Sequence, residues 1–100
     1  MSDREQQAAL FAALVSMLQA SAMQAMGKLR NDHTGKVERN LPLARLLIDM
    51  LNMLHERMGG VLEPGEERTL ASVLTDLRLN FVDESARQEP EKEEKGETPP

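Results

Sequence analysis

The chain has 100 residues, enough for one small domain, and its large apolar residues are Leu, Met, Val and Ile, with two Phe and no Trp or Tyr. This composition suits helix packing better than a pleated sheet. The absence of cysteine excludes disulfide frameworks, zinc fingers and thiol chemistry, and a net charge of −5 argues against nucleic-acid binding by bulk attraction to phosphate.

The first predicted element is a helix over residues 3–27. Ser2 and Glu5 have the spacing of a capping box, and Gly27 is a plausible end for the helix. One apolar stripe has helical spacing and consists of Phe11, Val15, Leu18, Ala22, Ala25 and Leu29. A second stripe holds small residues that let another helix backbone come close: Ala9, Ala13, Ser16 and Ala20.

The chain carries no charge from Gln6 to Gly27, which allows three interpretations. A signal peptide needs a positive start, whereas Asp3 and Glu5 outnumber Arg4. A membrane span is long enough but is interrupted by four polar residues, Ser16, Gln19, Ser21 and Gln24. We therefore expect a cytoplasmic protein without membrane contact, in which protein covers this helix on more than one side.

The second predicted helix covers residues 41–58 and follows a polar loop over 30–39. Asn40 is a suitable N-cap, Pro42 fits the first turn, and Gly59 with Gly60 stops the helix. Its apolar arc is wide, and its polar stripe is narrow, consisting of Arg45, Asp49, Asn52 and Glu56.

The third predicted helix covers residues 64–85 and is amphipathic, with a proper polar face. Pro64 opens it, and Glu66 and Glu67 lie against the positive end of its dipole. Residues 86–100 have no large apolar side chain and predict a disordered acidic tail. The expected organisation is thus an all-α helical domain over 1–85 followed by a tail over 86–100.

Two of these helices have more apolar surface than a three-helix chain can cover. The remaining surface predicts a homo-oligomer, with a homodimer as the commonest solution. In that dimer the first helix packs across the two-fold axis through Ala9, Ala13, Ser16 and Ala20, and part of the second helix joins the interface.

No group of residues in the sequence predicts catalysis, a cofactor or a bound metal. His33 and His55 are not accompanied by residues at metal-ligand spacing, and Asp49 and Glu56 resemble ordinary carboxylates on a wet helix face. Gly59-Gly60 lacks the residues that complete a phosphate loop. We therefore expect a non-enzymatic interaction or regulatory protein whose protein partner is unknown.

Two alternatives for a binding surface stay open. Five basic residues surround the first loop, namely Lys28, Arg30, Lys36, Arg39 and Arg45. They would suit a small RNA- or ribosome-associated factor, although no aromatic residue is interleaved for base stacking. Six methionines could instead line an adaptable groove for a partner helix: Met17, Met23, Met26, Met50, Met53 and Met58.

The order of these signals resembles a family of domains of unknown function, family 1844. The resemblance rests on DREQQAALFAALV, the TGK turn, ERNLPLARLLIDMLNML, the GG stop, LEPGEE and LTDLRLNFV, and it covers residues 3 to about 84. The sequence departs from the family pattern at Glu63, where members more often have Thr or Ser. The resemblance implies a short, helical, cytoplasmic bacterial protein and supplies no activity, ligand or catalytic residue.

Overall fold

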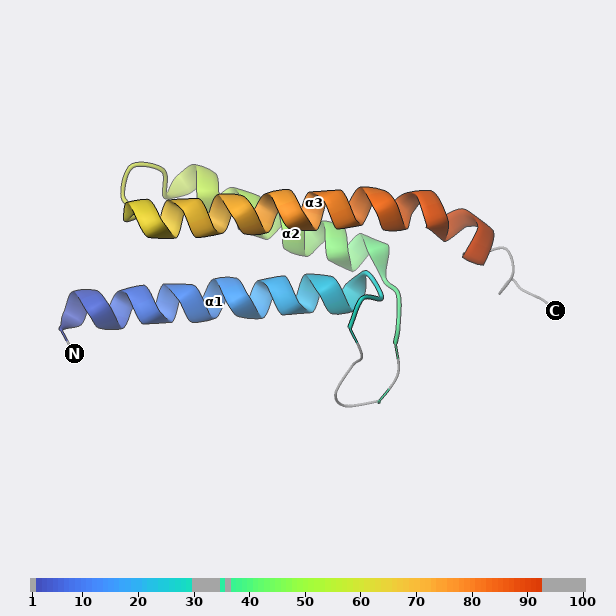
Figure 1. Ribbon diagram of the computed structural model, residues 1–100, viewed down its shortest axis with the longest axis horizontal. Helices are drawn as coiled ribbons and strands as arrows, with labels where there is room; N and C mark the ends of the chain where they lie inside the picture. The colour runs from blue at the N-terminus through green and yellow to red at the C-terminus, as the bar shows by residue number, and fades with distance from the viewer. Residues whose placement is uncertain (1, 30–34, 36, 93–100) are drawn as a thin grey trace.

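The computed structural model describes residues 2–29, 35 and 37–92, with side chains up to Arg87. Three helices make up the fold: α1 (Asp3–Ala25), α2 (Leu41–Arg57) and α3 (Pro64–Lys92). α1 and α3 run in the same direction along the bundle, and α2 runs antiparallel to both (Figure 1). The predicted all-α class and the number of helices are confirmed.

Local hydrogen bonds set the predicted helix starts. The Ser2 hydroxyl accepts from the Glu5 amide at 3.2 Å while the Ser2 amide donates to the Glu5 carboxylate at 3.0 Å, which completes the capping box. Asn40 Oδ1 accepts from the Leu43 amide at 3.1 Å and caps α2. Both helix starts that the sequence predicted from capping residues are confirmed.

The turn out of α1 depends on a glycine. Gly27 has φ of +83°, and a Cβ there would lie 3.1 Å from Cγ of Arg39. The Asn40 amide donates to the Ala25 carbonyl at 2.7 Å, so the chain enters α2 directly beside the place where α1 ends. Residues 30–34 and 36 of the predicted polar loop lie outside the described residues.

The third helix is longer than predicted. It continues to Lys92, whereas the apolar pattern predicted an end at residue 85. Apolar periodicity stops at Val82, but Arg87 reaches back one turn to the Glu84 carboxylate at 2.8 Å, a spacing that supports a helix beyond the apolar pattern. The remainder of the predicted tail, from residue 93, lies outside the described residues.

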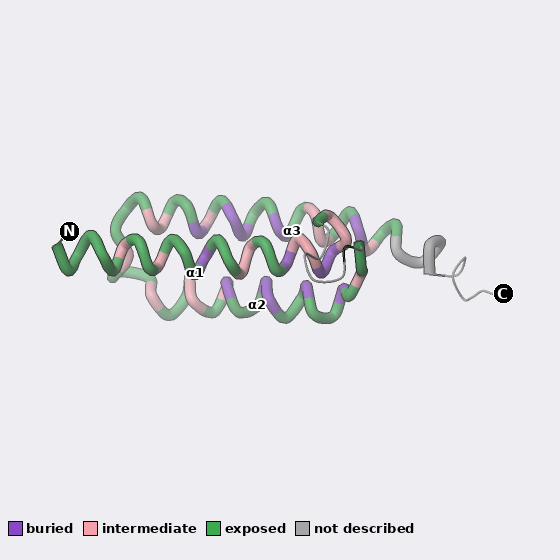
Figure 2. The backbone as a smooth tube through the Cα atoms, turned by 90° about the horizontal axis from the view of Figure 1, so that it is seen from below, coloured by how far each residue is buried: buried purple, intermediate pink, exposed green. Residues whose placement is uncertain are grey.

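The core is a single cluster of buried residues where the three helices meet. Its buried residues face one another along the bundle (Figure 2). Three of them are alanines, which let helices approach closely, and Met26, Leu51, Leu70 and Leu77 are the largest fully buried side chains. The complete set is Val15, Ala22, Ala25, Met26, Leu41, Ala44, Leu47, Ile48, Leu51, Leu70, Val73, Leu74 and Leu77.

Candidate functional site

Large apolar side chains remain exposed along both α1 and α2. On α1 the exposed fractions are 63% for Leu10, 43% for Leu14 and 67% for Met17. On α2 the exposed residues recur at steps of three and four. We call the whole set the α1–α2 face: Leu10, Leu14, Met17, Leu43, Leu46, Met50 and Met53.

Both halves of this face border the seam between α1 and α2. Leu10 and Leu14 line a groove together with Met58, which places them on the α2 side of α1. On α2, the polar stripe faces α3, because Asn52 Oδ1 accepts from Arg78 of α3 at 2.7 Å. The exposed apolar stripe lies on the opposite flank of α2, and because α1 and α3 are the helices packed on α2, the flank away from α3 is the one beside α1.

The four small residues proposed for self-association lie on the other flank of α1. Ala9, Ala13, Ser16 and Ala20 are all exposed, so none of them is used in the core. Close approach between helices within the chain uses Ala22, Ala25 and Ala44 instead. The outward side of α1 is therefore uncharged across its full width, with small residues on one flank and Leu10, Leu14 and Met17 on the other.

An open groove of about 880 Å³ lies at one end of the bundle, between the first turns of α1 and the connection from α2 to α3. Its large apolar lining residues are Leu10, Phe11, Leu14, Met58, Val61 and Leu62. Its rim carries the carboxylates of Glu5, Glu63 and Glu66, and Arg4 bridges the two sides through an ion pair with Glu63 at 3.0 Å. The groove is thus apolar inside and acidic at its edge.

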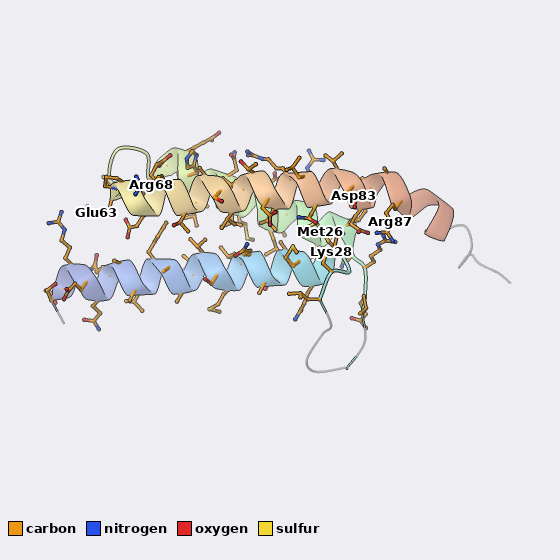
Figure 3. The ribbon with its side chains drawn as sticks, in the orientation of Figure 1. Met26, Lys28, Glu63, Arg68, Asp83 and Arg87 are labelled. Atoms are coloured by element: carbon orange, nitrogen blue, oxygen red, sulfur yellow. The ribbon has the colours of Figure 1, made fainter. Side chains whose placement is uncertain are left out.

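A buried carboxylate occupies the opposite end of the bundle. Glu84 is only 2% exposed and binds three cations from three segments: Arg39, Lys28 at 2.7 Å and Arg87 at 2.8 Å. Figure 3 shows Lys28, Asp83 and Arg87 gathered there, far from Glu63. The sequence did not predict this cluster, although Glu84 continues the apolar register of Leu77 and Phe81 in α3.

Burial of Glu84 on its own raises the pKa of its carboxyl, but the hydrogen bonds from Lys28 and Arg39 outweigh that effect and leave the pKa below its ordinary value of 4.5. The hydrogen bond to Glu84 raises the pKa of Lys28 above 10.5. Glu84 and Lys28 are therefore both ionised throughout the neutral range.

These directions predict how stability depends on pH. A carboxyl with a lowered pKa in the folded state stabilises that state above pH 4.5, and this contribution is lost as the pH falls through the folded value. The raised pKa of Lys28 stabilises the folded state below pH 10.5, and this contribution is lost as the pH rises above that value towards the folded pKa. We expect urea midpoints to fall more steeply below pH 4.5 in wild type than in Glu84→Gln. Parallel acid limbs in the two proteins would contradict this assignment.

The five basic residues considered for RNA binding do not form one solvent-facing set. Lys28 and Arg39 bind the buried Glu84, and the Arg39 side chain is only 13% exposed. Arg45 is exposed on α2 with Asp49 at 4.0 Å. Arg30 and Lys36 lie outside the described residues. The structure thus gives two of the five cations a place in the fold.

The remaining sequence candidates have ordinary surroundings. His55 Nε2 lies 2.6 Å from Glu67 Oε2 and links the end of α2 to the start of α3, while His33 lies outside the described residues. Asp49 and Glu56 are exposed, and Glu56 accepts from Asn52 at 3.2 Å. Within residues 2–29, 35 and 37–87, no three His, Cys, Asp or Glu side chains are grouped so as to hold a metal ion.

The six methionines divide between the core and the surface. Met26 is fully buried, Met23 and Met58 are half-buried, and Met17, Met50 and Met53 are exposed on the α1–α2 face. Among the helices that the structure describes, α1 is the one that is long and apolar enough to cross a membrane, and 17% of its most apolar window is buried. By length and composition alone, a core helix or an N-terminal signal sequence has the same properties.

The fold and the exposed face define a small all-α protein whose most apolar helix is covered on one side by its own chain. The chain belongs to the family described as domain of unknown function (DUF1844), whose model matches residues 8–84. This confirms the resemblance seen in the sequence. No curated protein and no solved structure matches the chain.

Proposed function

We propose that this protein is a non-enzymatic, cytoplasmic bacterial interaction protein that self-associates through the α1–α2 face. The observation that carries the proposal is the row of seven large apolar side chains left exposed along the seam of α1 and α2. Apolar residues at this density on two adjacent helices are typical of a surface that another protein covers.

The size of the face favours a second copy as its occupant. Its seven large side chains expose on the order of 600 Å², which is at the upper limit for the largest apolar patch of a monomer. The small residues on the outward side of α1 enlarge this area towards the roughly 800 Å² that each partner contributes to a standard interface. A face that is uncharged throughout is also self-complementary, as a two-fold dimer requires.

Light scattering after size-exclusion chromatography in detergent-free buffer tests the proposal. We expect the full chain to have twice its 11.2 kDa monomer mass by light scattering at micromolar concentration. A glutamate placed in the centre of the face must lose its hydration when two copies pack, so Met17→Glu and Leu46→Glu should yield monomers that remain helical by circular dichroism.

Leu79→Glu is the matched control, because Leu79 on α3 has the same 67% exposure as Met17 but lies outside the face. It should remain dimeric. A monomeric wild-type chain overturns the proposal, as does a requirement for detergent, which would assign α1 to a membrane. Equal loss of the dimer in all three variants would show that the effect is not specific to this face.

A further inference from the structure

Resting on the proposed self-association, we propose that the two copies pack antiparallel, so that Leu29 and Val37 at the α1–α2 connection of one copy enter the acidic-rimmed groove of the other. The groove adjoins the α1–α2 face, with which it shares Leu10 and Leu14, and the α1–α2 connection lies at the other end of the bundle. An antiparallel dimer is the arrangement that covers all of them at once.

The position of the connection supports this arrangement. Leu29 is 44% exposed and Val37 is 60% exposed, so this end of the bundle presents two more apolar side chains that the core does not use. The described segment that leads into α2, residues 37–40, rises past the end of α1 from the side away from α3 (Figure 1). A second copy that covers the outward side of α1 would meet this segment.

The register of α1 and α2 places the groove within reach of the α1–α2 connection of a second copy. The bond between Asn40 and Ala25 fixes the start of α2 beside the end of α1. With equal rise per residue in both helices, Met50 then lies level with Leu14 or Val15, near the middle of the face. A two-fold axis at that point carries the connection of one copy to the first turns of α1 in the other, where the groove begins.

The charges at the two ends of the bundle disfavour the parallel alternative. The end with the groove holds six acidic residues, Asp3, Glu5, Glu56, Glu63, Glu66 and Glu67, against three arginines, Arg4, Arg57 and Arg68. The described residues at the other end carry four basic residues, Lys28, Arg39, Arg87 and Lys92, and five acidic ones, Glu38, Asp83, Glu84, Glu89 and Glu91, so this end is less acidic. A parallel dimer would bring the two more acidic ends together, whereas the antiparallel dimer places each of them beside a less acidic one.

The groove also has the character needed to receive such side chains. Val61, which is 73% exposed, and Leu62 form part of its apolar wall together with residues of α1. Without an occupant this wall is in contact with water. Two aliphatic side chains from a second copy would bury it without placing a charge against the carboxylates of its rim.

The chain has no cysteine, so single-cysteine variants can report which residues meet. Val37→Cys and Val61→Cys are prepared with tags of different mass, mixed to exchange subunits and treated with a short bismaleimide. We expect the mixed 37–61 product to dominate over the 37–37 and 61–61 products. Leu79→Cys, on α3, serves as the control and should cross-link with neither.

Each other outcome has a definite meaning. Dominant 37–37 and 61–61 products would overturn the antiparallel arrangement and leave the proposed dimer standing, as would a dimer by light scattering with no cross-link between residues 37 and 61. A monomer would overturn both proposals. As a second measurement, Val37→Ser should weaken dimerisation several-fold, and Val82→Ser on α3 should leave it unchanged.

Discussion

Replacing Glu84 by Gln is expected to destabilise the fold by about 3 kcal/mol, the usual cost of removing one partner from a buried ion pair. The substitution preserves the shape of the side chain and removes its charge. Arg39, whose side chain is 13% exposed, and Lys28 would then face a neutral amide in a site built for a carboxylate. Urea unfolding followed by circular dichroism at fixed protein concentration measures the change.

The matched control is the neighbouring residue. Asp83→Asn removes a carboxylate whose side chain is 61% exposed and whose distance to Lys28 is 3.6 Å. Pairs of this kind contribute little, so the unfolding midpoint should hardly move. If the two variants were equally stable, Glu84 would not be the residue that fastens α3 to the α1–α2 connection.

The position of Glu84 explains why the sequence did not reveal it. Its partners Lys28 and Arg39 lie 56 and 45 residues away along the chain, and only the packing of α3 against the end of α1 brings them together. Its register with Leu77 and Phe81 was visible in the sequence. A carboxylate at a core position in such a register is a sign that cations lie across the interface.

Features that depend on a few neighbouring residues were predicted well. The capping box at Ser2 and Glu5, the Asn40 cap and the stop before Gly59 each involve groups within one helical turn, so the sequence contains all the partners. The end of α3 was predicted too early, because the prediction followed apolar periodicity, and a helix can continue on propensity and ion pairs after that periodicity ends.

The exposed side of α1 could not be predicted with the same certainty. Apolar residues occur on all sides of this helix, so its sequence is compatible with burial of either flank. The packing of the three helices determines which side of α1 is buried. α2 and α3 cover Val15, Ala22 and Ala25. The stripe of small residues and the flank with Leu10, Leu14 and Met17 stay exposed. The sequence indicated that α1 has more contact surface than its own chain can cover, and the register of α2 determined where that surface lies.

The close contact between α1 and α2 leads to the second large effect that we expect. Ala44 is fully buried at the start of α2, in the same cluster as Ala22 and Ala25 at the end of α1. Ala44→Leu adds a bulky group where no space is left, so the two helices must move apart or distort their side chains. We expect a loss of about 2 kcal/mol, within the usual range for overpacking a core.

Ala86→Leu makes the same chemical change at an exposed position of α3 and controls for the small difference in helix propensity. Urea midpoints of the two variants should therefore differ clearly, with Ala44→Leu the lower. The displacement in Ala44→Leu would also spread the two helices that carry the α1–α2 face, so dimerisation should weaken together with stability. If Ala44→Leu unfolded at the wild-type midpoint, the alanines of α1 and α2 would not hold these helices in close contact, and the α1–α2 face would lack the fixed spacing that a specific interface requires.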